Sequence, residues 1–156
     1  MSLAGNIIKI INSDSRYTIN EMSYKAPINS RNDEMSAIRL KNLYNKGWFK
    51  LKDYDIEDAS AIIELILEKH LLKPIYLIDN KSSIVSKVVA GELDLFSICK
   101  YLNNEFALIG VDDLEGKKFD EIPVKLQNRL EDKNVSLIYL DDTTTPEMIQ
   151  KIIKYR

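Results

Sequence analysis

The chain has 156 residues, of which 45% are hydrophobic and 29% are charged, and its formal net charge is −2. This length and composition predict a single compact domain over residues 1–156 and exclude a disordered tail. The weakly negative charge argues against a protein dedicated to nucleic acid or to a membrane surface. Ile, Lys and Asn are abundant, which is typical of AT-rich genomes and is not a sign of function.

Cysteine content and hydropathy indicate in which cellular compartment the protein is expected. Cys99 is the single cysteine, so no internal disulfide can form and packing must supply the stability. No apolar run approaches the roughly 18–20 residues that cross a bilayer, and the first residues lack the basic and apolar regions of a signal peptide. We therefore expect a cytoplasmic protein with no membrane partner.

Charge is distributed unevenly along the chain. Residues 1–52 carry nine Lys and Arg against four Asp and Glu, whereas residues 53–156 carry thirteen against twenty. This asymmetry suggests two sub-parts within the domain, a basic, β-rich part at residues 1–55 and an acidic, α/β part at residues 56–156.

The N-terminal part predicts β structure. Residues 6–12 alternate weakly between apolar and polar side chains, and residues 16–24 alternate more clearly. The Ser-Asp-Ser sequence at residues 13–15 is typical of a turn, so the two segments predict a β-hairpin. Residues 25–32, which include Pro27, predict a loop.

Residues 37–55 allow two interpretations. Ile38 and Leu40 alternate with basic residues ahead of a turn at residues 45–47, which would make a second hairpin. A helix over residues 33–45, stopped by glycine, also fits. We favour this helix, followed by a strand at residues 48–51.

The middle of the chain mixes helices and strands. Residues 58–71 predict the clearest helix, because their isoleucines and leucines repeat at helical spacing. An apolar strand follows at residues 75–78. Residues 82–89 predict either the return strand of a hairpin or a helix, and Gly91 then breaks the chain before a helix at residues 93–102.

The C-terminal part follows an α/β pattern. Residues 106–111 predict a strand of the buried type, and residues 120–132 predict an amphipathic helix. Residues 135–140 predict another strand. Thr145 is a good N-cap for a helix that begins with proline and runs to Tyr155.

Taken together, the elements predict an α+β fold. In this fold a β-containing N-terminal part is followed by an α/β C-terminal part whose mixed sheet is flanked by helices.

Motifs for most catalytic chemistries are absent from the sequence. There is no phosphate-binding or dinucleotide-binding glycine motif, and one cysteine with one histidine cannot make a Cys/His metal site. His70 lies near the end of the clearest helix, where a histidine stabilises the helix terminus more often than it catalyses a reaction. Cys99 lies on an apolar helix face and predicts core packing rather than a nucleophile. We assign no catalytic residue.

Acidic residues follow three predicted strands at the point where each strand ends. In open α/β sheets, ligands bind beyond the carboxyl ends of parallel strands, and carboxylates that converge there can hold Mg²⁺. Aspartate is also a common turn and helix-cap residue, and this ordinary role is the more frequent one. The candidate metal ligands are Asp79, Asp112, Asp113, Asp141 and Asp142.

Basic and aromatic residues interleave in the first third of the chain. Cations beside exposed rings suit a single-stranded nucleic acid or an acidic protein partner, although lysines that alternate with apolar residues are more often a solvated surface. Trp48 and Phe49 cannot both face one side of a strand, so at least one of them is expected in the core. The candidate binding residues are Arg39, Lys41, Lys46, Trp48 and Lys50.

These observations favour a small non-enzymatic module for protein interaction or regulation, such as an accessory, immunity-type or anti-defence component of a low-GC bacterium or its phage. Its partner would be another protein or a second copy, and it would need no cofactor. One alternative is a divalent-metal-dependent enzyme that acts on phosphoesters or nucleotides, with Mg²⁺ held by the strand-end aspartates. A weaker alternative is a nucleic-acid-binding module.

Overall fold

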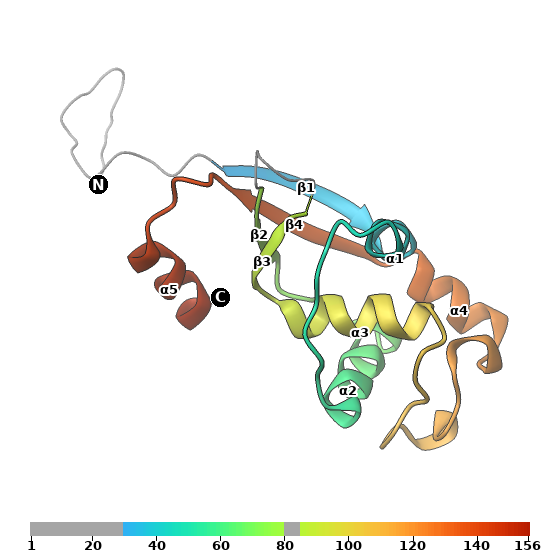
Figure 1. The fold of residues 1–156 in the computed structure, drawn as a ribbon. Helices are drawn as coiled ribbons and strands as arrows, with labels where there is room; N and C mark the ends of the chain where they lie inside the picture. The colour runs from blue at the N-terminus through green and yellow to red at the C-terminus, as the bar shows by residue number, and fades with distance from the viewer. Residues whose placement is uncertain (1–29, 80–84) are drawn as a thin grey trace, which may run out of the picture.

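The computed structural model describes residues 30–79 and 85–156 (Figure 1). The hairpin predicted for residues 6–24 lies outside the described residues.

The described residues form a four-stranded mixed sheet. The central strand β4 pairs on one side with β1 in antiparallel orientation and on the other side with β2 in parallel orientation. β3 completes the order β1-β4-β2-β3 by antiparallel pairing with β2. The strands are β1 (Ser30–Ser36), β2 (Ile75–Ile78), β3 (Lys87–Ala90) and β4 (Asn134–Leu140).

Five α-helices accompany this sheet in the described part of the chain, and they flank it as the sequence predicts (Figure 1). Two short 3-10 turns, η1 (Asp112–Leu114) and η2 (Phe119–Glu121), lie between α3 and α4. The prediction of an α+β fold is therefore confirmed. The helices are α1 (Ala37–Asn45), α2 (Ile56–Leu67), α3 (Glu92–Leu102), α4 (Val124–Glu131) and α5 (Pro146–Tyr155).

The main core lies between one face of the sheet and the helices α1 to α4. Alternate residues of β4, among them Val135 and Leu137, point into this core, and the register places Ile75 of β2 beside Leu137. α3 is the most buried helix, and it packs against both α1 and α2. Because α3 is surrounded in this way, Ile98 at its centre has no exposed surface.

The second face of the sheet carries the other residues of the same strands. Ser136 and Ile138 of β4 are only half-buried there, and they line a hollow of about 400 Å³ beside β1. Farther along this face, Ala90 and Leu140 are buried without belonging to the main core. α5 packs at this end of the sheet, against β3.

The region around α1 resolves the two interpretations in favour of a helix. The helix begins at residue 37 rather than 33, because the Ser36 side chain caps it by accepting a hydrogen bond from the Arg39 N–H. The residues ahead of this cap form β1, so the predicted loop at residues 25–32 is wrong for residues 30–32. The strand predicted at residues 48–51 is also wrong, since only Phe49 makes an isolated bridge, with Ser86.

The predicted strand at residues 106–111 is wrong for a clear physical reason. Phe106, Leu108 and Val111 are buried, but the backbone bonds to its own loop rather than to the sheet. The N–H of Leu108 donates to the Lys117 carbonyl at 3.0 Å, and the N–H of Gly116 donates to the Leu108 carbonyl at 2.8 Å. The apolar run therefore marks a loop that is packed against the core.

Most of the remaining predictions need only a change of boundary. The helix predicted at 58–71 spans Ile56–Leu67, and the one predicted at 120–132 is divided by Pro123 into η2 and α4. Of the two interpretations of residues 82–89, the return strand is correct from Lys87 onward. The helix capped by Thr145 is confirmed.

Candidate functional site

Two of the three acidic strand ends meet. β2 and β4 are parallel neighbours, so Asp79 and Asp141 leave the sheet at the same edge, where ligands bind in open α/β sheets. They line a shallow pocket of about 230 Å³ together with Arg31, Tyr139 and Asp142. The sequence leaves open whether the acidic strand ends converge, and the parallel pairing of β2 with β4 brings these two together.

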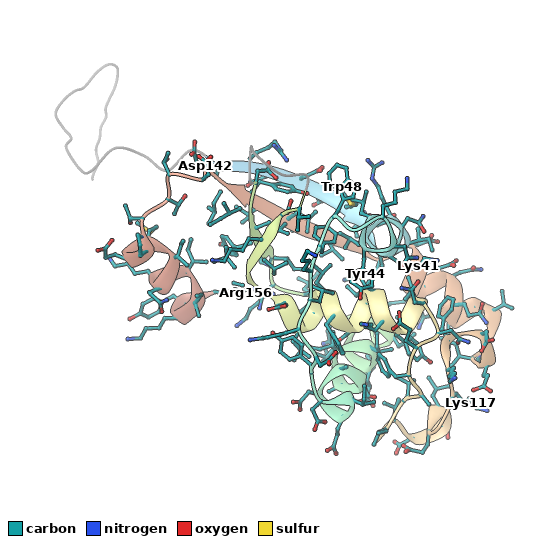
Figure 2. All side chains as sticks on the ribbon, viewed as in Figure 1. Lys41, Tyr44, Trp48, Lys117, Asp142 and Arg156 are labelled. Carbon is teal, nitrogen blue, oxygen red and sulfur yellow. The ribbon has the colours of Figure 1, made fainter. Side chains whose placement is uncertain are left out.

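The third acidic pair lies elsewhere. Asp112 and Asp113 begin η1, on a loop rather than at the end of a strand, and they are absent from the lining of this pocket. Figure 2 shows the separation, with Asp142 at one end of the molecule and Lys117, which follows η1, toward the opposite end. Within residues 30–79 and 85–156, no three acidic, His or Cys side chains are arranged to hold a metal ion. The five aspartates therefore do not form one site.

The carboxylates at the shared edge already have partners within the chain. Nη1 of Arg31 lies 3.3 Å from Oδ2 of Asp79, and the same guanidinium lies 4.1 Å from the centre of the Tyr139 ring. Oδ1 of Asp141 accepts hydrogen bonds from the N–H and the hydroxyl of Thr143, both at 2.9 Å. These contacts match the turn role of aspartate.

The two classical catalytic residue types are far from a catalytic arrangement. Cys99 is fully buried, and burial raises the pKa of its thiol to about 12, so the thiol is protonated and unreactive at neutral pH. His70 is exposed just beyond α2, with Nε2 3.5 Å from Oε1 of Glu68. The core role predicted for Cys99 is confirmed.

The candidate binding residues occupy α1 and the connection that follows it. We call Arg39, Lys41, Lys46, Trp48 and Lys50 the basic surface. Arg39 and Lys46 are separated by seven residues and lie on the outer stripe of α1, whereas Lys41 lies on its flank, on the side of Tyr44 (Figure 2). The five residues thus adjoin one another along one segment, but they do not all share one face.

The backbone of Trp48 is held in place by hydrogen bonds to two neighbouring segments. Its backbone N–H donates to the Leu43 carbonyl at 3.0 Å, and its backbone carbonyl accepts from the Ser86 N–H at 2.9 Å. The next side chain, Phe49, is 3% exposed and belongs to the core, while the Trp48 side chain is 40% exposed. The prediction that one of the two aromatic residues is core is therefore confirmed, and the indole is left on the surface.

The cations of the basic surface have no partner in the described part of the chain. Other basic residues do, for example Lys100 on Glu105, Arg129 on the Leu67 carbonyl and Lys133 on the His70 carbonyl. No such side-chain hydrogen bond or ion pair exists there for Arg39, Lys41, Lys46 or Lys50.

Sequence reasoning missed one well-defined polar site, which centres on Arg156. Its guanidinium bonds to Asp94 and to two backbone carbonyls before β2, more than 60 positions away in sequence. No local pattern indicates such partners.

No protein-family model matches the chain, and no curated protein or solved structure is detectably similar to it. Among the described helices, none is long and apolar enough to span a membrane. Arguments about function therefore depend on the residues described above.

Proposed function

We propose that the chain is a non-enzymatic interaction domain that binds an acidic segment of another protein through the basic surface. The observation that carries this proposal is Trp48, whose backbone is held by two hydrogen bonds and whose side chain is left 40% exposed, with Lys46 and Lys50 two residues away on either side in sequence. Tryptophan contributes strongly to binding energy at protein interfaces because it buries a large area when a partner covers it.

The charges beside Trp48 indicate the chemistry of the partner. Lys46 and Lys50 flank Trp48 in sequence, and neither is neutralised by a carboxylate within the described residues. A partner with Asp or Glu beside an apolar side chain would neutralise the lysines and cover the ring at once. The overall charge of −2 favours an acidic protein segment over nucleic acid, which normally requires a strongly basic binding protein.

Affinity purification from the native host tests the proposal. We expect the wild-type chain to recover a specific protein, and Trp48→Ala to reduce its recovery about tenfold or more, because loss of an interface tryptophan commonly costs about 2 kcal/mol. The double variant Lys46→Glu/Lys50→Glu should abolish recovery. The matched control is Lys125→Glu/Lys151→Glu, which changes the net charge equally at exposed positions on α4 and α5.

Two outcomes would contradict the proposal. In the first, all variants recover the same proteins as the wild type. In the second, nuclease treatment removes the bound material, which would assign the basic surface to nucleic acid. A steep loss of oligonucleotide binding with salt would then support that reading.

The alternative of a metal-dependent enzyme is tested separately, at the edge where Asp79 and Asp141 meet. A metal that binds the folded chain must raise its melting temperature. We expect no change in melting temperature in millimolar Mg²⁺ or Mn²⁺, because Arg31 already pairs with Asp79. A rise that Asp79→Asn abolishes would favour the enzyme.

A further inference from the structure

α5 is attached to the rest of the molecule differently from the other described helices. Its apolar residues Met148, Ile149 and Ile152 are half-buried, Ile153 is half-exposed, and no residue of the helix is fully buried. Residues 141–145, which join it to β4, contain no helix or strand. Apolar packing alone therefore holds α5 weakly.

The principal polar attachment of α5 is Arg156, which caps its end. Nη2 of Arg156 lies 2.7 Å from Oδ2 of Asp94, a buried residue in the first turn of α3. Nε donates to the Pro74 carbonyl at 2.7 Å, and Nη2 also lies within bonding distance of the Lys73 carbonyl. Figure 2 shows Arg156 reaching from α5 to the start of α3.

The receiving site is built around the guanidinium. Gly91, the N-cap of α3, has a φ of +88°, and a Cβ atom there would lie 2.6 Å from Nη2 of Arg156. A side chain at position 91 would therefore occupy the space that Arg156 fills. In return, Nζ of Lys73 donates to the Arg156 carbonyl at 3.0 Å. We call this set of contacts the Arg156 lock.

The part of the sheet beside α5 is apolar. Cross-strand pairing places Ala90 beside Tyr76 and places Leu140 beside Ile78, all on the face opposite the main core. Ala90 and Leu140 are 8% and 4% exposed, respectively, and α5 packs against β3, the strand that carries Ala90.

We propose that α5 is a releasable arm, which the Arg156 lock holds against β3 at the edge of the sheet. Release breaks the lock and the shallow packing of α5, while the main core and its helices stay intact. A ten-residue helix is marginal on its own, so the released arm loses its helical hydrogen bonds. The arm is independent of the basic surface and of the function proposed for it.

Hydrogen exchange of the full chain, read by mass spectrometry at neutral pH, tests the proposal. We expect amides in residues 150–155 to exchange about a hundredfold faster than amides in residues 96–102 of α3, because local opening requires far less free energy than global unfolding. Arg156→Gln should accelerate exchange in α5 by a further tenfold or so and leave α3 unchanged, since a hydrogen bond to a charged group is lost.

Two further variants keep the test decisive. Asp94→Asn removes the ion pair but keeps an acceptor oxygen, so it should accelerate hydrogen exchange in α5 less than Arg156→Gln does. The double variant Asp94→Asn/Arg156→Gln should exchange in α5 little faster than Arg156→Gln alone. Lys151→Gln changes an exposed charge of α5 outside the lock and should change nothing. Equal exchange rates in α5 and α3 of the wild type, or equal acceleration of both helices in Arg156→Gln and Asp94→Asn, would overturn the proposal.

Discussion

α3 and α5 are amphipathic helices of similar length beside the same sheet, yet they are held in opposite ways. Eight of the eleven residues of α3 are buried, and its neighbours α1 and α2 pack on two sides of it. α5 has ten residues, none of them fully buried, and its firmest contacts belong to one guanidinium. The comparison shows that an apolar stripe determines which side of a helix faces the protein, whereas the surrounding elements determine how much of that stripe is buried.

Truncation at the centre of α3 should have the largest effect. We expect Ile98→Ala to lower the free energy of unfolding by about 3–4 kcal/mol, because the side chain is fully buried and its removal leaves a cavity. Urea denaturation followed by circular dichroism measures this loss. A loss below about 1 kcal/mol would mean that α3 is not the centre of the core.

Substitution of Gly91 tests the contact between the start of α3 and Arg156 at the end of α5. Gly91→Ala should cost about 2 kcal/mol or more, from the strained positive φ and from the collision with Arg156. Gly116→Ala is the matched control, since its φ is +76° and a Cβ there meets nothing within 4 Å. Equal losses for the two variants in urea denaturation would show that the collision contributes nothing.

Alkaline pH should act through α3, where burial raises the pKa of Cys99 to about 12. A thiol whose pKa is raised by folding keeps its proton longer in the folded state. Its stabilising contribution is therefore complete below the pKa of the unfolded thiol, and it is lost as the pH rises toward the folded value. Burial also raises the pKa of Tyr101 on the same helix.

We expect the free energy of unfolding to fall between about pH 9 and pH 12, and to fall less in Cys99→Ala, when urea titrations are repeated across this range. Alkylation provides a second readout. At pH 8 the thiol of the folded chain should react only as fast as α3 opens. Rapid alkylation without unfolding would contradict the burial of Cys99.

The smallest effect should come from α5. Ile152→Ala removes a half-buried side chain, and the better helix propensity of alanine offsets part of the loss, so we expect less than about 1 kcal/mol in urea denaturation. A loss as large as that of Ile98→Ala would end the contrast between the two helices and would argue against a releasable arm.

Several helices and strands could be predicted because their signals are local. The helix pattern at residues 93–102, the cap at Thr145 and the apolar strand at 135–140 appear within short windows of sequence and are confirmed. β1 could not be predicted in this way. Its sequence SRNDEMS has no apolar alternation, since Met35 is its only buried residue, and its strand conformation depends on pairing with β4 about a hundred positions later.

In the candidate site, too, features with a local sequence signal could be predicted and features that depend on distant residues could not. Local alternation predicts that Trp48 and Phe49 do not both face one side, so that at least one is core. The meeting of Asp79 with Asp141 depends on the parallel pairing of β2 with β4, which local patterns do not indicate. The placement of Asp112 was wrong because a buried loop and a buried strand have the same apolar composition. The Arg156 lock was missed because three of its partners lie more than 60 positions away.

The order of strands along the chain has a consequence for synthesis on the ribosome. β4 is the only strand that pairs with β1 in the described sheet, and β1 is translated about a hundred residues earlier. Until residue 134 emerges, β1 has no strand partner there, while β2 and β3 can already form their hairpin. A nascent chain would therefore hold the polar strand β1 in water until β4 is synthesised and joins the two parts of the sheet.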